Sequence, residues 1–377
     1  MTPSKSNTNP LKIAIIGSRG YPHVYSGYET LIKELSERLV ERGCEVTVYC
    51  HRNLFKEKPA FVNGIKLVYV PTIETKSLSQ LIHSFLSMCH AVVSGVDVIF
   101  AVNAANGPFG LISKIFRKPT AINVDGLEWL RPKWKGLGAI YFKIAARLST
   151  ILYDQIINDS LEMRKVYLNM FKKESVVIAY GATIKKSVDY SLIQQWLIMP
   201  KEYYLVVGRM IPDNNADIIV KGFLASNSTK KMVIVGDVFY KDNYADALKA
   251  INDERLIFTG YVNDPEVLAA LYHHCYVYVH GHEFGGTNPT MIKAMAYGCA
   301  ILALNTVFNK EMLNNDLYGI YFEKNHAAVR QQIDYAEQHP KQIKKLSQNS
   351  HLGITDKYNW GCITDQYLEV FRRLAER

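Results

Sequence analysis

Short apolar runs alternate along the chain with stretches in which apolar residues recur at helical spacing. Residues 12–16 form an apolar run that ends at Gly17, as expected of a buried parallel strand that feeds a loop. Residues 29–40 carry their apolar side chains on one helical face, and Gly43 is a typical helix stop before the strand-like run 45–50. The start of the chain therefore predicts a strand–helix–strand unit.

The same alternation continues in two series. Further strand-like runs cover residues 96–101, 120–124 and 155–158 in the first half, and 203–208, 232–236, 256–260 and 276–279 in the second half. Alternating strands and helices indicate doubly wound parallel sheets, and 377 residues are too many for one ordinary core. We therefore expect an α/β fold of two Rossmann-like domains, residues 1–190 and 191–356, followed by one last amphipathic helix.

A Gly-rich loop follows a strand-like run in each half. In the second half, Gly285 and Gly286 precede Pro289, which stands where a helix would begin. Such a loop lets the backbone approach phosphate and aims free N–H groups at it, so it predicts a site for a nucleotide diphosphate. A comparable loop over residues 17–20 and 26–27 leads us to expect two facing domains that hold a nucleotide sugar between them.

Charge and cysteine spacing narrow the classes of protein. The net charge is +9, and residues 1–190 hold 25 of the 44 Lys and Arg but 15 of the 35 Asp and Glu. A basic half suits nucleic acid, a phosphate-rich ligand or an anionic membrane. No nucleic-acid-binding motif accompanies the charge, so we expect no nucleic-acid partner. The six cysteines are widely spaced without a C-x-x-C pair, which indicates neither a disulfide framework nor a zinc site.

The sequence indicates neither a signal peptide nor a membrane-spanning helix. Residues 1–10 are polar and no stretch reaches about 18 uncharged apolar residues, so we expect a cytoplasmic protein. Residues 129–143 interleave Trp and Tyr with Lys and Arg. This pattern suits the headgroup zone of a membrane or buried packing beneath a binding site, and both interpretations stay open. Peripheral contact with the inner face of the membrane is therefore one expectation.

Four motifs together resemble a known family. They are Ile16-Gly17-Ser18-Arg19-Gly20-Tyr21-Pro22, Ser26-Gly27-Tyr28-Glu29-Thr30, Asn123-Val124-Asp125-Gly126-Leu127-Glu128-Trp129 and Gly285-Gly286-Thr287-Asn288-Pro289. In this order they resemble the retaining glycosyltransferases of family 4, and more narrowly a bacterial subgroup of β-1,4-rhamnosyltransferases of capsule and O-antigen synthesis. The resemblance spans nearly the whole chain. It implies a GT-B fold, with the acceptor on the first domain, the nucleotide sugar on the second, and a helix over about residues 357–377 that completes the first domain.

In the first domain, the resemblance implies roles for three residues. Gly27 would approach the donor phosphate or the acceptor, and its place just ahead of a helix agrees, although an ordinary tight turn explains it too. Asp125 follows a strand and would orient a sugar hydroxyl or accept the acceptor's proton, or simply turn the chain at Asp-Gly. Glu128 would bind acceptor hydroxyls or be a solvated first-turn acid. Further candidates for acceptor binding in these motifs are Arg19, Glu29 and Trp129.

In the second domain, the implied residues surround the donor. Arg209 would bridge the two phosphates and stabilise the leaving diphosphate, or be a surface arginine. Asn214 stands where relatives usually carry a Lys, so this clamp has one cation fewer. Backbone groups of Tyr261 and Val262 would face the base. The remaining donor-binding candidates are Gly285, Gly286, Thr287, Asn288 and Lys293.

Lys293 bears on the choice of nucleotide. Family 4 enzymes generally carry two glutamates eight positions apart, and here these positions hold Gly285 and Lys293. Gly285 matches the narrow subgroup. An ammonium group cannot accept hydrogen bonds from a ribose diol as a carboxylate does. A dTDP-sugar, which has no ribose 2′-hydroxyl, loses less from this change than a UDP-sugar, and Glu283 is a candidate to compensate in part.

The resemblance also implies a mechanism. Transfer with retention would take place on one face of the sugar, with the leaving phosphate helping to deprotonate the incoming hydroxyl. Donors around the diphosphate would be Arg209 and the N–H groups of residues 286–288. The chain has no Asp-x-Asp motif of the kind that holds a metal–diphosphate complex, so we expect no metal and no cofactor.

These observations leave a leading hypothesis and alternatives. The leading one is a glycosyltransferase that moves L-rhamnose from dTDP-rhamnose to a saccharide acceptor of a surface polysaccharide, with the acceptor linked to a lipid diphosphate. A UDP- or GDP-sugar donor is the near alternative. Lys293 and Asn214 leave open a catalytically silent GT-B protein that binds a nucleotide or a partner. A Rossmann oxidoreductase is disfavoured, because the first loop lacks the G-x-G-x-x-G spacing.

Overall fold

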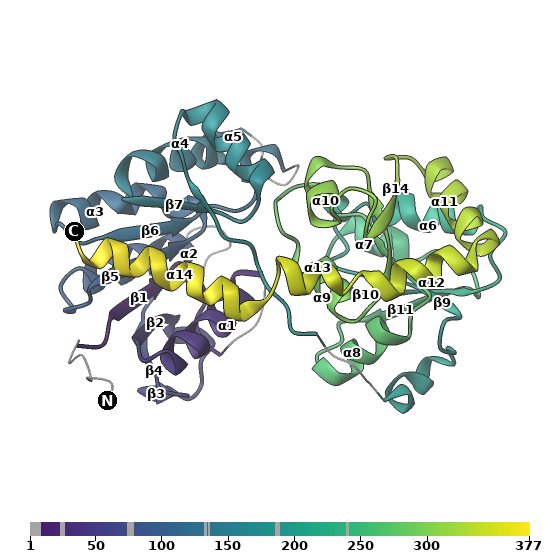
Figure 1. Cartoon of the computed structure of the whole chain (residues 1–377), viewed down its shortest axis with the longest axis horizontal. Coiled ribbons are helices and arrows are strands. Elements are labelled where there is room, and N and C mark those ends of the chain that lie inside the picture. Colours follow the sequence, from purple (N-terminus) through teal and green to yellow (C-terminus); the bar gives the residue numbers. More distant parts are fainter. Residues whose placement is uncertain are drawn as a thin grey trace, which may run out of the picture. The chain divides into compact units, whose positions relative to one another are not determined.

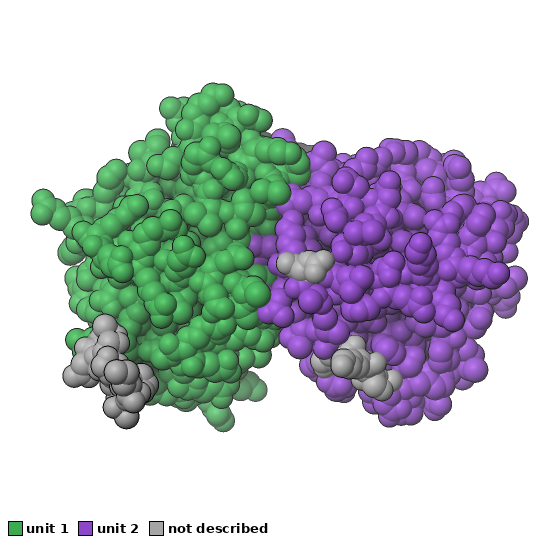
Figure 2. Space-filling model, viewed as in Figure 1, with its two compact units in different colours: residues 1–129, 134–178, 360–377 green, residues 130–133, 179–359 purple. Residues whose placement is uncertain are grey.

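A computed structural model describes residues 9–22, 27–73, 79–131, 134, 136–184, 189–238 and 241–377. Three parts of the predictions lie outside the described residues: Ser26 of the second motif, part of the aromatic and basic segment 129–143, and residues 185–188, just before the expected domain boundary. The chain divides into two compact units (Figure 2). Unit 1 comprises residues 1–129, 134–178 and 360–377, and unit 2 comprises residues 130–133 and 179–359.

Unit 1 is built on an eight-stranded sheet that follows from its apolar runs (Figure 1). Its strands are β1 (Lys12–Ile16), β2 (Glu45–His51), β3 (Phe61–Val62), β4 (Ile65–Val70), β5 (Val98–Val102), β6 (Thr120–Asn123), β7 (Gln155–Asn158) and β8 (Val176–Val177). Their order is β3-β4-β2-β1-β5-β6-β7-β8, and every pair except β3–β4 is parallel. β5 is buried at every position, as expected of a strand in a sheet covered on both faces.

Helices connect these strands and pack on the sheet. The longer ones are α1 (Gly27–Glu41), α2 (Ser79–Ala91), α3 (Gly110–Ile115), α4 (Leu137–Leu152), α5 (Leu161–Phe171) and α14 (Trp360–Ala375). The apolar face expected of residues 29–40 is confirmed, because Leu31, Ile32, Leu35 and Leu39 of α1 are fully buried. The predicted helix stop is also confirmed: Gly43 follows α1 with φ +82°.

Unit 2 is built on a six-stranded, all-parallel sheet. Its strands are β9 (Tyr203–Val207), β10 (Lys231–Val235), β11 (Leu256–Gly260), β12 (Val277–His280), β13 (Ala300–Leu304) and β14 (Gly319–Phe322), in the order β11-β10-β9-β12-β13-β14. This is the doubly wound Rossmann order, in which the connection changes direction between the first and fourth strands. Here that switch point lies between β9 and β12, which pair in parallel.

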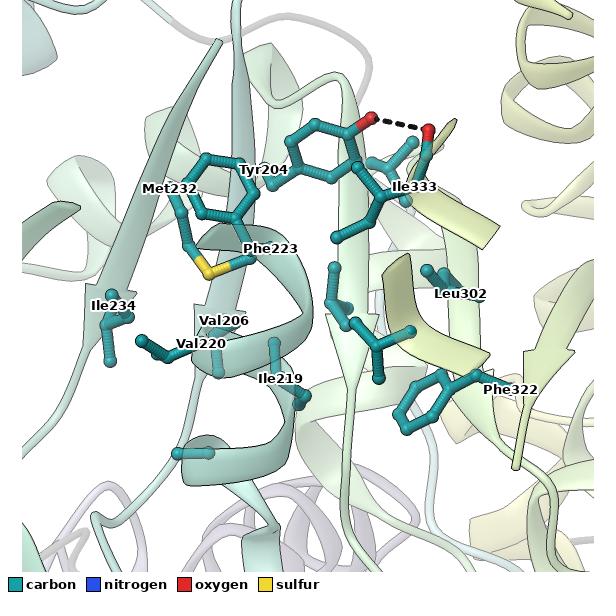
Figure 3. Close-up of a cluster of buried hydrophobic side chains, with 14 of the residues drawn as sticks. Tyr204, Val206, Ile219, Val220, Phe223, Met232, Ile234, Leu302, Phe322 and Ile333 are labelled. Carbon is teal, nitrogen blue, oxygen red and sulfur yellow. Dashed lines mark hydrogen bonds between the residues drawn. The ribbon is translucent and has the colours of Figure 1, made fainter. Parts of the chain in front are cut away.

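Helices of unit 2 cover its sheet. They include α6 (Ala216–Leu224), α7 (Asn243–Lys249), α8 (Pro265–His274), α9 (Pro289–Ala296), α10 (Val307–Met312), α11 (His326–Gln338), α12 (Pro340–Asn349) and α13 (Leu352–Asp356). Side chains of β9, β10 and β13 meet those of α6 and α11 in a buried apolar cluster (Figure 3). The Tyr204 hydroxyl lies 3.5 Å from the backbone oxygen of Ile333 (Figure 3) and donates to Glu337 Oε1 at 2.9 Å, so the polar end of this buried ring has its partner on α11.

The division between the units differs from the expected boundary after residue 190. Ala182 forms an isolated parallel bridge with Asn359, and its N–H donates to the Tyr358 oxygen at 2.9 Å. This pairing ties residues that follow 178 to unit 2 and moves the division toward residue 179. Helix α14 belongs to unit 1, where Phe371 and Tyr367 pack on Phe100 of β5.

Candidate functional site

The carboxyl ends of β9 and β12 bring two separate loops of unit 2 together. Residues 208–214 follow β9, and residues 281–288 follow β12. The Glu283 N–H donates to the Asp213 oxygen at 3.1 Å, and the Asn215 side chain donates to the Gly281 oxygen at 2.9 Å. A Cβ at Gly281 would lie 2.2 Å from the Asn214 oxygen, so only a glycine allows this approach. Both loops with predicted donor ligands therefore meet at the topological switch point of the second sheet.

A second close approach shapes the same edge. Gly236, at the end of β10, has φ +120°, and a Cβ there would lie 2.1 Å from the Gly208 oxygen. Its N–H donates to the Gly260 oxygen at 2.8 Å, which joins the ends of β10 and β11. Gly208, Gly236 and Gly260 thus lie at the carboxyl ends of β9, β10 and β11, and the backbones of the first two pack directly against each other.

Arg209 and Asn214 occupy the loop after β9. Arg209 is exposed, so its guanidinium is accessible at this edge. Asn214 uses its side chain within the protein: its amide donates to the Arg209 oxygen at 2.7 Å, and its carbonyl oxygen pairs with Nδ1 of His282 at 2.8 Å. Asn214 therefore links the two loops to each other.

The loop before α9 has the conformation expected of a helix start. Pro289 is the first residue of α9, which confirms the predicted position, and the Asn288 side chain caps the helix by accepting from the Thr290 N–H at 3.0 Å. Gly285 has φ +113°, while Gly286 and Thr287 are buried. The N-terminal N–H groups of α9 and the helix dipole favour an anion at this point.

Two histidines that sequence reasoning did not select lie behind this loop. His280 pairs with the Tyr278 hydroxyl at 3.1 Å, and that hydroxyl also donates to Thr290 at 3.0 Å. Burial lowers the pKa of His280 to about 3. Burial, with the positive charges of Arg131 and Arg209 adding to it, lowers the pKa of His282 well below its usual range. Both rings are therefore neutral at physiological pH and act through hydrogen bonds.

The ring of His282 is held from both loops. Because the Asn214 amide nitrogen donates to a backbone oxygen, its carbonyl oxygen is the group that pairs with Nδ1 of His282. A backbone hydrogen bond at Phe284 also acts on the ring and opposes the fall of its pKa. The sequence signal for both residues is the His-Gly-His run that ends β12.

The other predicted donor ligands lie around the same edge. Tyr261 and Val262 directly follow β11, and the Tyr261 side chain is exposed. Lys293 lies on α9, half-buried, one turn after the cap. The structure thus brings the predicted residues of unit 2 to one sheet edge, and their contacts with a ligand stay predictions.

In unit 1 the first predicted carboxylate has an unexpected partner. Asp125 follows β6, and the Tyr28 hydroxyl donates to its Oδ1. Burial, together with the negative charge of Asp125, raises the pKa of Tyr28 well above its usual range, so this phenol stays protonated. Asp159, buried at the end of β7, adds a second carboxylate whose charge acts on Tyr28, Tyr167 and Tyr367. The sequence signal for Asp159 is the one used for Asp125, an acid directly after a strand.

The remaining candidates of unit 1 are engaged in structural contacts. Glu29 is buried and accepts from the Arg19 N–H at 3.1 Å, which holds the loop after β1. Glu128 accepts from the Trp134 indole at 2.8 Å. Trp129 packs edge-on against Tyr167 and Phe171, with ring centroids 6.4 Å apart in both pairs. Gly27 is the first residue of α1.

Family models match both halves of the chain. Residues 191–352 match the family described as glycosyl transferases group 1. Residues 11–183 match a domain of unknown function, DUF1972. The first match covers the predicted donor residues from Arg209 to Lys293, and the second covers Asp125 and its neighbours.

A curated relative is similar over part of the chain. It is the N-acetylgalactosamine-N,N'-diacetylbacillosaminyl-diphospho-undecaprenol 4-alpha-N-acetylgalactosaminyltransferase of Campylobacter jejuni, 22% identical over 148 residues. The matched segment spans 39% of this chain and 40% of the relative.

Solved structures share the fold over nearly the whole chain. HepE of Anabaena, solved in complex with UDP, has a TM-score of 0.76 at 16% identity and covers 96% of this chain and 100% of its own. Sucrose-phosphate synthase of Thermosynechococcus elongatus has a TM-score of 0.79 at 16% identity and covers 97% of this chain and 99% of its own. With the two parallel sheets, these likenesses confirm the GT-B fold. Within the described ranges, no helix is both long and apolar enough to cross a bilayer.

Proposed function

We propose that this chain transfers a sugar from a nucleotide donor to a saccharide acceptor, because its residues 191–352 match the model of the group 1 glycosyl transferases and its fold is GT-B. The observation that carries this proposal is the convergence of Arg209 and the Gly285–Asn288 loop on the switch point of the second sheet. Ligands of open α/β sheets bind at that point. The matched family model and the fold support a glycosyltransferase of the GT-B type.

The donor diphosphate would lie against the start of α9. The exposed Arg209 guanidinium and backbone N–H groups of the loop before α9 would supply donors where charge grows as the sugar–phosphate bond breaks. The Asn288 N–H is already used within the protein, because it donates to Met312 Sδ at 3.2 Å. His282 would add a neutral ring, which Asn214 holds in the loop after β12. With the incoming hydroxyl on the leaving-group side, a phosphate oxygen would take its proton, and the product would retain the donor's configuration. We propose that this transfer needs no metal.

The acceptor would bind on unit 1 at Asp125. Its carboxylate emerges at the carboxyl edge of the first sheet and is held by the Tyr28 hydroxyl. A carboxylate in that position can orient a sugar hydroxyl. Arg19, Glu29, Glu128 and Trp129 would then shape the surroundings of the acceptor through the loops that they hold in place.

For the donor we propose dTDP-L-rhamnose, and for the product a rhamnosylated precursor of a capsule or O-antigen. The support is the subgroup motif at residues 285–289 and Lys293, which lacks the acceptor atoms that a ribose diol requires. A lipid-diphosphate-linked acceptor, met at the inner face of the membrane, agrees with the undecaprenol-linked substrate in the name of the Campylobacter relative. A UDP-sugar donor is the second candidate, favoured by the UDP bound to HepE.

Binding and turnover test the proposal. A nucleotide that binds only the native state at about one hundred times its Kd stabilises it by about 2.7 kcal/mol, so the melting temperature should rise with dTDP more than with UDP or GDP. Release of nucleoside diphosphate from a panel of nucleotide sugars then identifies the donor. A larger rise with UDP would replace the dTDP assignment, and indifference to all three would refute a nucleotide-sugar enzyme.

The diphosphate contact is tested by Arg209→Ala. Removing one donor from a developing negative charge lowers kcat by about a hundredfold, with the protein still folded. Arg330→Ala is the matched control, because Arg330 is an exposed arginine of α11 in the same unit. Equal rates for the two variants would exclude Arg209 from the site, and a loss of activity with EDTA would contradict metal-independent transfer.

A further inference from the structure

We infer that the α3–α4 face of unit 1 docks on an anionic membrane surface. This face is defined by the exposed side chains of α3, of α4 and of the two residues after α3. It deepens the proposed function, which requires an acceptor carried in a membrane, but it rests on exposure and charge in unit 1 alone.

Helix α4 presents an apolar stripe to solvent. Leu137, Ile140, Ile144 and Ile151 are 85%, 55%, 54% and 53% exposed. Their spacing of three, four and seven residues places them on one side of a helix that is about 24 Å long. The opposite side, with Phe142, Ala145 and Ala146, is buried against the unit.

Helix α3 extends this stripe. It packs against α4 (Figure 1), and Lys114 donates to the backbone oxygen of Ile151 at 3.3 Å, at the last turn of α4. Leu111, Ile115 and Phe116 are each more than half exposed. Large side chains exposed together on neighbouring helices indicate an interaction surface, whereas single exposed ones need no explanation.

The charge on this face decides which partner fits. Lys114, Arg117, Lys143 and Arg147 are exposed among the apolar residues. The sequence contains no Asp or Glu between Asp97 and Asp125, nor between Glu128 and Asp154. No ion pair between described residues involves Arg117, Lys143 or Arg147.

Apolar side chains flanked by basic ones match the boundary of an anionic bilayer. The isoleucines would enter the level of the acyl chains, and the ammonium and guanidinium groups would reach lipid phosphates. A second copy of this chain would place like charges opposite each other, which disfavours self-association through this face. The aromatic and basic segment 129–143 from the sequence analysis shares Leu137, Ile140 and Lys143 with the α3–α4 face.

Vesicle binding tests this inference on the full chain, without donor or acceptor. The protein should sediment with vesicles of phosphatidylcholine and phosphatidylglycerol, and much less with phosphatidylcholine alone. The double variant Ile140→Glu, Ile144→Glu should bind at least about tenfold more weakly, and Lys143→Gln with Arg147→Gln should lose most of the preference for phosphatidylglycerol.

The control is Val307→Glu, since Val307 of α10 is 57% exposed and lies on unit 2. It should bind vesicles as the parent protein does. Absence of vesicle binding, equal binding by the Ile140/Ile144 variant, or a dimer that this variant dissociates would each overturn the inference. Nucleotide-induced thermal shifts report on unit 2 separately, so failure of docking and failure of the proposed function are distinguishable.

Discussion

Single side chains hold the loops at the carboxyl edges of both sheets. In unit 2, Asn214 joins the loops after β9 and β12 through Arg209 and His282. In unit 1, the Tyr28 hydroxyl binds Asp125. The bonds of Asn214 to His282 and of Tyr28 to Asp125 each join two elements. The geometry of the candidate site therefore depends on side chains that position residues with predicted chemistry.

We expect Tyr28→Phe to lower the transfer rate without changing donor binding. The substitution keeps the ring and removes the hydroxyl that orients Asp125, so kcat should fall by about tenfold, in the range of a lost positioning contact. Steady-state kinetics combined with nucleotide-induced thermal shifts measure both quantities.

Tyr49→Phe is the control, because the Tyr49 hydroxyl pairs with His90 in the same unit, at 2.8 Å and away from Asp125. If Tyr28→Phe and Tyr49→Phe have the same kcat, Tyr28 does not position a reacting group.

A second prediction at this scale concerns pH. His83 of α2 is fully buried and stacks on His51, with ring centroids 3.9 Å apart. Burial, and next the neighbouring His51, lowers the pKa of His83 to about 3. Between pH about 6.5 and about 3 the unfolded chain binds a proton that the folded protein does not, so the free energy of unfolding falls by up to about 1.4 kcal/mol per pH unit as pH falls.

His83→Phe should remove this contribution. Urea unfolding of both proteins at pH 7 and pH 5 should show a smaller loss of stability in the variant. Parallel losses would mean that His83 is protonated in the folded protein over this range, contrary to its burial.

At the scale of elements, several strands of unit 2 end at positions where only glycine allows two backbone segments to approach. The ends of β9 and β10 approach through Gly208 and Gly236, and the loop after β12 approaches Asn214 through Gly281. The apolar pattern alone predicted nine strands that the structure confirms, namely β1, β2, β5, β6, β7, β9, β10, β11 and β12. β3, β4, β8, β13 and β14 were not predicted, although β13 is an apolar run, because short apolar runs do not distinguish a strand from buried helix.

We expect Gly236→Ala to disrupt the donor edge. The new methyl group would meet the Gly208 oxygen at 2.1 Å, in addition to the cost of about 1–2 kcal/mol for a side chain at positive φ. Urea denaturation should show a clearly larger loss than Gly298→Ala, whose φ is +72° but whose Cβ would lie 3.4 Å from its nearest neighbour. The nucleotide-induced thermal shift should also shrink in Gly236→Ala alone. Equal losses would show that the β9–β10 approach is not tight.

At the scale of the whole molecule, the chain returns from unit 2 to complete unit 1. Helix α14 was expected as an amphipathic tail, and the resemblance implied that it completes the first domain. Its buried face includes Tyr367, Leu368, Phe371 and Leu374. The buried side of α14 is therefore part of the core of unit 1.

We expect Phe371→Ala to cost about 3–5 kcal/mol of unfolding free energy, because it removes a fully buried ring beside Phe100. Glu369→Ala changes an exposed residue of the same helix and should leave stability within about 0.5 kcal/mol. Urea unfolding followed by circular dichroism measures both variants. A cost for Phe371→Ala as small as that of Glu369→Ala would mean that α14 does not contribute to this core.

The sequence alone determined the alternation of strands and helices, the two-domain α/β class and the Gly-rich loop with Pro289 at a helix start. These features depend on neighbours along the chain, namely apolar period, turn residues and caps. Only the tertiary structure decided which strand ends lie side by side, and hence that Asn214 meets His282 and Tyr28 meets Asp125. Such pairs are far apart in sequence and carry no local signal, because packing of the sheets, and not the residues beside them, brings them together.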